Sequence, residues 1–126
     1  SGSKSDELHI EKLSGYLIKH NIYYREHICS AHKSTKELLN ILDEYTNNGK
    51  RINRKMVFIT VAGMSNALSG ITTCNTHYPV VACPPHSDKV DMMTNINSTL
   101  QMPSKVPVAT ILNPENCVLF CKKILN

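Results

Sequence analysis

The chain has 126 residues, of which 41% are hydrophobic and 19% are charged, a composition typical of one globular domain able to bury a core. No run approaches the roughly 18 apolar residues of a membrane span, and no signal-peptide core is evident, so we expect no membrane partner. The formal charge is +4, but basic residues cluster only at Lys50-Arg51 and Arg54-Lys55. We therefore expect no nucleic-acid partner, whereas a small phosphorylated ligand fits this charge.

The first part of the chain predicts a helix, a strand and a second helix. Residues 5–20 carry leucines at near-helical spacing, and Asn21 is a plausible stop. Residues 22–29 alternate apolar and charged side chains, which favours a strand. Ser34 and Glu37 form a capping box that predicts the start of the next helix, and residues 47–49 (Asn-Asn-Gly) predict its end.

The rest of the chain continues this alternation. The apolar run at residues 56–62 predicts a strand buried on both faces, and a short helix is expected over residues 65–74. Further strands are expected at residues 78–83 and 106–112. The remaining predicted helices cover residues 88–101 and the segment that follows a cap at Asn113-Pro114-Glu115. Strands that alternate with helices indicate an α/β protein, with a parallel sheet covered by helices on both faces.

The first residues look like a loop between a strand and a helix, but no strand precedes them. In a parallel sheet that strand would be central. We therefore expect a single domain over residues 1–126, with its first strand ahead of residue 1.

The five cysteines are an odd number, which favours free thiols in a reducing, cytoplasmic compartment. Cys117 and Cys121 would share one face of a helix, as zinc ligands can. No second close pair of Cys or His supplies further ligands, so we expect buried packing and no metal.

Three loops combine unusual residues with positions where open α/β sheets bind ligands, at the carboxyl ends of strands. They are residues 2–6, 30–33 and 62–66. A glycine-serine loop that opens a helix offers backbone N–H groups to an anion, although Ser3 or Ser5 could equally be a plain N-cap.

His32 is the candidate general acid/base, because histidine has a reference pKa of about 6.5 and Lys33 beside it could hold a phosphate. The other histidines carry weaker expectations: His9, His20 and His27 are expected to be solvated, and His77 and His86 are minor candidates for ligand contact. Neither Ser65 nor Ser69 lies in a nucleophile elbow.

Six motifs together resemble the phosphoribosylaminoimidazole carboxylases of purine synthesis, in the order found there and over essentially the whole chain. The motifs are Gly2-Ser3-Lys4-Ser5-Asp6, Ser30-Ala31-His32-Lys33, Ala62-Gly63-Met64-Ser65-Asn66, Tyr78-Pro79-Val80, Gln101-Met102-Pro103 and Val106-Pro107-Val108-Ala109-Thr110. The resemblance implies a flavodoxin-like three-layer α/β/α fold, a homo-octamer with active sites at subunit junctions, and no cofactor.

The family has two classes, which rearrange an N-carboxylated aminoimidazole ribonucleotide or add carbon dioxide directly to aminoimidazole ribonucleotide. The rearranging mutases typically have arginine after Ser-Ala-His and a second histidine in a glycine-alanine-rich loop. This chain has Lys33, a loop without histidine at residues 62–70, and Cys83-Pro84-Pro85, which resembles the direct carboxylases. We therefore expect the direct carboxylase; a mutase, a non-catalytic nucleotide-binding module and a flavin-binding protein remain alternatives.

The resemblance also implies roles for individual residues. His32 is expected to be the catalytic proton shuttle, and Ser30 to lie beside the reacting ring. The remaining residues are expected to bind substrate: Ser3, Ser5, Asp6 and Lys33 at the phosphate and ribose, and Gly63, Ser65 and Asn66 at the imidazole and carbon dioxide.

Overall fold

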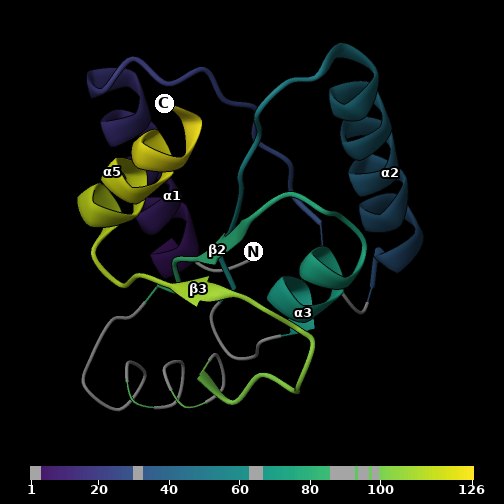
Figure 1. Ribbon diagram of the computed structural model, residues 1–126. Helices are drawn as coiled ribbons and strands as arrows, with labels where there is room; N and C mark the ends of the chain where they lie inside the picture. The colour runs from purple at the N-terminus through teal and green to yellow at the C-terminus, as the bar shows by residue number, and fades with distance from the viewer. Residues whose placement is uncertain (1–3, 30–32, 63–66, 86–92, 94–96, 98–99) are drawn as a thin grey trace.

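A parallel three-stranded sheet forms the centre of the molecule (Figure 1). The computed structural model describes residues 4–29, 33–62, 67–85, 93, 97 and 100–126. The strands are β1 (Phe58–Thr60), β2 (Val80–Ala82) and β3 (Ala109–Thr110), in the order β1-β2-β3. Both pairs are parallel, with Ile59 opposite Val81 and Val81 opposite Ala109. The predicted parallel sheet is therefore confirmed, with strands shorter than the apolar runs that contain them.

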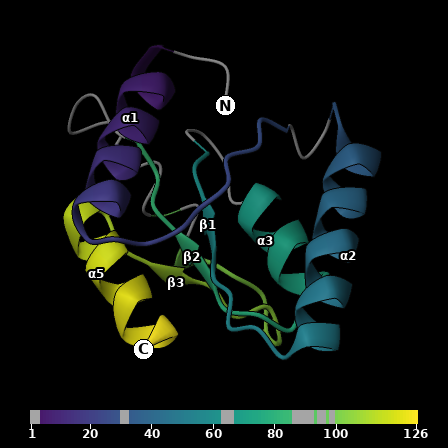
Figure 2. The ribbon, with the colours of Figure 1, turned by 90° about the horizontal axis from the view of Figure 1, so that it is seen from above.

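Helices lie on both sides of this sheet, as Figure 2 shows. On one side α1 (Lys4–Lys19) packs against α5 (Pro114–Leu125), and on the other lie α3 (Ala67–Cys74) and α2 (Thr35–Ile52). Residues 93, 97 and 100 are helical, in agreement with the helix expected over residues 88–101, most of which lies outside the described residues.

The core lies where α1 and α5 cover β2. Val81, Cys83, Cys117 and Val118 are at most 1% exposed, and Leu13 of α1 joins the same cluster. Burial of β2 on both faces explains its continuous apolar sequence.

The strand predicted over residues 22–29 is not formed. This segment has no regular secondary structure, and the side chains of Tyr23 and Ile28 are 76% and 71% exposed. A strand needs a neighbour that exchanges backbone hydrogen bonds with it, and no described strand lies beside this segment. Alternation of side chains alone therefore could not make it a strand.

An apolar groove of about 350 Å³ separates this segment from the sheet. It is lined by α1, residues 22–29, α2 and β1, with Leu13, Leu42 and Ile59 among its walls. Among the described strands, β1 pairs only with β2, so its other edge faces this groove. The open groove explains why Val57, Phe58 and Ile59 are only half-buried, contrary to the prediction of a strand buried on both faces.

Helix α2 is longer than predicted and begins without the expected side-chain cap. Ser34 is the N-cap residue, but its side chain makes no capping hydrogen bond. The helix passes through Gly49, which is buried, and ends at Asn53, whose left-handed backbone (φ 52°) provides the C-cap. The prediction that residues 47–49 end this helix was therefore wrong.

Gly49→Ala is expected to destabilise the protein by about 1–3 kcal/mol, because the interior has no room for another methyl group. A Cβ at Gly49 would lie 2.9 Å from Cζ of Tyr78 and even closer to its hydroxyl oxygen. Tyr78 is held in place, since its hydroxyl donates to the Arg54 carbonyl at 2.9 Å. Urea unfolding measures the change in free energy.

Gly15→Ala is the matched control, because it lies within α1 and a Cβ there would meet nothing within 4 Å. It is expected to stabilise the protein by about 0.5–1 kcal/mol through helix propensity alone. Equal stabilisation by both substitutions would contradict the packing explanation for Gly49.

None of the helices described for this chain is long and apolar enough to cross a membrane.

Candidate active site

The carboxyl ends of all three strands lie at one edge of the sheet, because the strands are parallel. The chain leaves β1 at Val61, β2 at Cys83 and β3 at Ile111. This edge is where open α/β sheets bind ligands, and of the three expected site loops the one at residues 62–66 follows a strand, β1, along the chain.

His9 brings the N-terminal half of α1 to this edge. Its Nε2 lies 2.9 Å from the carbonyl oxygen and 3.3 Å from Sγ of Cys83, at the end of β2. His9 is only 7% exposed, so the expectation that it is solvated was wrong. The cause is helical spacing: His9, Leu13 and Leu17 recur every four residues and are all buried. The start of α1, which contains the backbone of residues 4–6, therefore lies less than two turns from the carboxyl end of β2.

A buried hydrogen bond connects β1, which precedes residues 63–66 in the sequence, with α3, which follows them. The hydroxyl groups of Thr60, the last residue of β1, and Ser69 of α3 lie 2.7 Å apart. Ser69 is 4% exposed, so it is a structural residue rather than an accessible nucleophile. The two ends of the expected imidazole-binding loop are thereby held at a fixed separation.

Cys29, which directly precedes the expected loop at residues 30–33, lies near β1. It lines the apolar groove together with Ile10 of α1, Val61 and Leu68. Burial raises the pKa of the Cys29 thiol, and the nearby Glu37 carboxylate raises it further. Lys33 is exposed and lies just before α2 in the sequence. Residues of α1, β1 and the first turns of α2 therefore line the same apolar groove.

Most of the predicted site side chains lie outside the described residues. This applies to Ser3, Ser30, His32, Gly63, Ser65 and Asn66, and His86 lies outside them as well. The backbone of Ser5 and Asp6 belongs to the first turn of α1, while Lys33 is described with its side chain. The roles given to these residues therefore remain predictions.

Thr110 lies at this edge and belongs to one of the six motifs, but the sequence gave it no role in the site. Its hydroxyl oxygen, at the end of β3, is buried and has no hydrogen-bond partner within the part of the chain that the structure describes. Threonine is so frequent in strands that its presence carries no functional signal.

The remaining histidines differ in their surroundings. His20 is partly buried and its Nε2 lies 3.0 Å from a Glu115 carboxylate oxygen. His27 is exposed, with its Nε2 2.9 Å from the Tyr45 hydroxyl, and His77 is exposed beside the Tyr78 ring.

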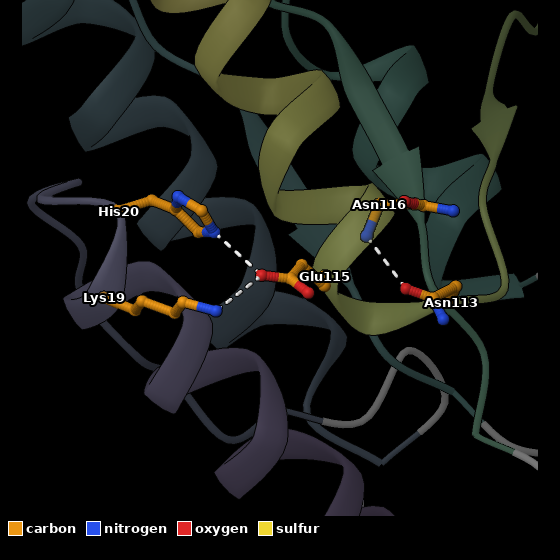
Figure 3. Close-up of polar contacts among 5 residues, drawn as sticks. All are labelled: Lys19, His20, Asn113, Glu115 and Asn116. Atoms are coloured by element: carbon orange, nitrogen blue, oxygen red, sulfur yellow. Dashed lines mark hydrogen bonds and ion pairs between the residues drawn. The ribbon is translucent and has the colours of Figure 1, made fainter.

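Lys19 and His20 join the end of α1 to the start of α5 through Glu115 (Figure 3). Hydrogen bonds from His20 and then Lys19 lower the pKa of the Glu115 carboxyl group. This contact therefore contributes to stability while Glu115 is ionised, and the contribution is lost as the pH falls and the carboxylate is protonated. Asn113 caps the same helix by accepting the backbone N–H of Asn116 at 3.0 Å, as predicted.

The buried cysteines form a packed cluster, as expected. Cys83, Cys117 and Cys121 are at most 2% exposed and all are free thiols. The hydrogen bond with Cys117 and then burial raise the pKa of Cys121. The Cys121 hydrogen bond lowers the pKa of Cys117, but a bond with Cys83 and burial outweigh it, so the net direction is upward. Within the described residues, no group of three or more His, Cys, Asp or Glu side chains is arranged to hold a metal ion.

A thiol reagent is expected to modify Cys74 rapidly in the native protein, because Cys74 is exposed whereas Cys83, Cys117 and Cys121 are buried and inaccessible to the reagent. Those three should react only after unfolding. Mass spectrometry after alkylation with and without denaturant identifies the modified residues. Rapid native alkylation of Cys117 or Cys121 would contradict the buried cluster.

The sheet and its helices define a flavodoxin-like α/β protein. The AIR carboxylase family model matches residues 1–126. The crystal structure of Treponema denticola PurE is similar to this chain, with a TM-score of 0.83 and 38% sequence identity. The match covers 98% of this chain and 75% of the PurE chain. The chain belongs to the AIR carboxylase family.

Individual proteins that are similar to this chain carry the same family name. A phosphoribosylaminoimidazole carboxylase of Archaeoglobus fulgidus is 42% identical over 98% of this chain, which spans only 64% of that protein's length. The Treponema denticola protein of the same name is 38% identical over 99% of this chain and 76% of its own length. A bifunctional phosphoribosylaminoimidazole carboxylase/phosphoribosylaminoimidazole succinocarboxamide synthetase of Drosophila melanogaster is 35% identical, with 98% of this chain matching 28% of that protein.

Proposed function

We propose that this chain catalyses the reversible addition of carbon dioxide to 5-aminoimidazole ribonucleotide, giving 4-carboxy-5-aminoimidazole ribonucleotide in purine biosynthesis. The observation that carries the proposal is the match of the AIR carboxylase family to every residue of the chain. The start of α1 and the carboxyl ends of β1 and β2 lie at one edge of the sheet, which supports the proposal. Residues 2–6 lead into α1, and residues 62–66 follow β1.

The chemical step of this reaction is the transfer of one proton, which a side chain can carry out without a cofactor. Aminoimidazole is an enamine whose ring carbon attacks carbon dioxide, and that carbon becomes tetrahedral while it still carries its proton. A base must remove the proton to restore aromaticity and must return it for decarboxylation. One histidine with a pKa near neutrality can do both, and we assign this role to His32.

The other residues position the substrate. Lys33 and Asp6, with Ser3 and Ser5, are proposed to hold the ribonucleotide's phosphate and ribose. Binding energy from this remote group can orient the ring, whose surroundings we assign to Ser30, Gly63, Ser65 and Asn66. The exposed position of Lys33 is compatible with contact to a soluble phosphate.

Direct carboxylation is favoured over rearrangement by the sequence differences at the expected site. Lys33 stands where the mutases typically have arginine, and residues 62–70 contain no second histidine. The buried segment Cys83-Pro84-Pro85 follows β2, and its sequence resembles that of the direct carboxylases.

The assembly proposed with this function is a cytoplasmic homo-octamer of single domains. Among the described strands β1 pairs only with β2, so its other edge, beside the apolar groove, offers backbone groups with which a further strand could pair.

A comparison of two substrates tests the proposal. The purified protein is given aminoimidazole ribonucleotide with carbon dioxide, or the N-carboxylated ribonucleotide, and formation of the carboxylated product is followed. We expect turnover that rises with dissolved carbon dioxide in the first case. Turnover with the N-carboxylated substrate alone would identify a mutase, and no product in either case would favour a binding module.

A further inference from the structure

Within the part of the sheet that the structure describes, no backbone N–H donates to the carbonyl group of Cys83. The ladder between β2 and β3 is followed by the bond from Ile111 N–H to the Ala82 carbonyl, at 3.0 Å. The Cys83 N–H donates to the Thr60 carbonyl at 2.9 Å. The next residues, Pro84 and Pro85, have no N–H group. A buried carbonyl left without a donor would destabilise this end of β2.

His9 supplies that donor from α1. Its Nε2 lies 2.9 Å from the Cys83 carbonyl oxygen, and because a carbonyl only accepts hydrogen bonds, Nε2 must carry the proton. The Cys83 Sγ, 3.3 Å away, can then be only a secondary acceptor of the same N–H. The Cys83 thiol has its own acceptor in the Leu112 carbonyl at 3.9 Å.

This bond connects two parts of the expected site that are 74 residues apart in sequence. His9 lies three residues after Asp6, within the first two turns of α1. Cys83 begins the buried segment Cys83–Pro85, through which the chain leaves β2. A shift of β2 relative to α1 would therefore move one side of the expected pocket against the other.

We propose that His9 is a positioning residue of the substrate site. Through the Cys83 carbonyl it holds the carboxyl end of β2 against the phosphate-binding start of α1. His9 itself touches no substrate. This inference rests on the proposed function, and it adds a residue to which the sequence gave no role.

His9→Leu and His9→Gln test the proposal, since leucine removes the donor whereas glutamine keeps an amide N–H at comparable reach. In His9→Leu we expect kcat to fall about tenfold with KM changed less than about threefold, because the phosphate anchor stays intact while ring alignment is lost. His9→Gln should recover kcat to within about threefold of the unsubstituted protein.

His20→Gln is the matched control: it alters a histidine just after α1 that bonds to Glu115, and full activity is expected. Circular dichroism and thermal melting show that each variant is folded at the assay temperature. A His9→Leu protein that is folded and kinetically identical to His20→Gln would overturn the proposal. So would equal losses in His9→Leu and His9→Gln.

A second measurement separates this inference from the proposed function. The ¹⁵N spectrum of the imidazole groups should show His9 protonated at Nε2 in the unsubstituted protein. The Nδ1–H form would overturn the hydrogen bond and the inference, whether or not the protein is active. If the unsubstituted protein has no carboxylase activity, the proposed function fails while the Nε2–H signal still tests the structural contact.

Discussion

Replacement of His32 by asparagine is expected to lower kcat about a thousandfold, because general acid/base groups contribute factors of about 10²–10⁴. Asparagine keeps a polar side chain of similar size but cannot accept and return a proton at neutral pH. Ribonucleotide affinity should stay within a few fold, since the phosphate contacts are assigned to other residues. Steady-state kinetics and calorimetric binding measure the two quantities separately.

His77→Asn is the control for this substitution. His77 precedes β2 and so lies toward the amino end of the strand, away from the carboxyl edge, where its ring lies against Tyr78. It should retain full turnover. Normal activity of His32→Asn would rule out His32 as the proton shuttle, and equal losses in both variants would show that the assay reports damage to the fold.

Lys33→Ala should raise KM for the ribonucleotide about tenfold to a hundredfold and change kcat little. Loss of a hydrogen bond to a charged group typically costs about 1.5–3 kcal/mol, which corresponds to this range. Lys36→Ala, another exposed lysine in the first turn of α2, should leave KM unchanged. An unchanged KM in Lys33→Ala would remove this lysine from the phosphate site.

The helices could be predicted well because their signals are local. The apolar spacing in α1 and the Asn113 cap of α5 each specify an element from a few neighbouring residues. The same holds for the alternation of strands and helices that indicated a parallel sheet. Packing in the interior was harder to predict. Gly49 was expected to end its helix, whereas it lies within α2, where the ring of Tyr78 leaves no room for a Cβ.

Strand formation and histidine burial depend on partners that are remote in sequence. Residues 22–29 have the alternation of a strand, but no neighbouring strand among the described residues satisfies their backbone. His9 was expected to be solvated on the face of its helix, yet it is buried against Cys83, which is 74 residues away in sequence. Neither the missing neighbour of residues 22–29 nor the partner of His9 could be predicted from a local sequence pattern.

The candidate site was predicted through motifs rather than through periodicity. Glycine, serine and histidine at the ends of predicted strands indicated a ligand site at the carboxyl edge of the sheet. The resemblance to the carboxylase family then implied the expected substrate and the expected roles of residues such as His32 and Lys33. The contact between His9 and Cys83 required the structure.

The most direct test of the central claim is the release of carbon dioxide from 4-carboxy-5-aminoimidazole ribonucleotide by the purified protein, after treatment with a chelator and without ATP or biotin. The proposed mechanism predicts decarboxylation to aminoimidazole ribonucleotide well above the uncatalysed rate. A rate equal to that of the uncatalysed reaction, from folded protein that binds the ribonucleotide, would contradict it.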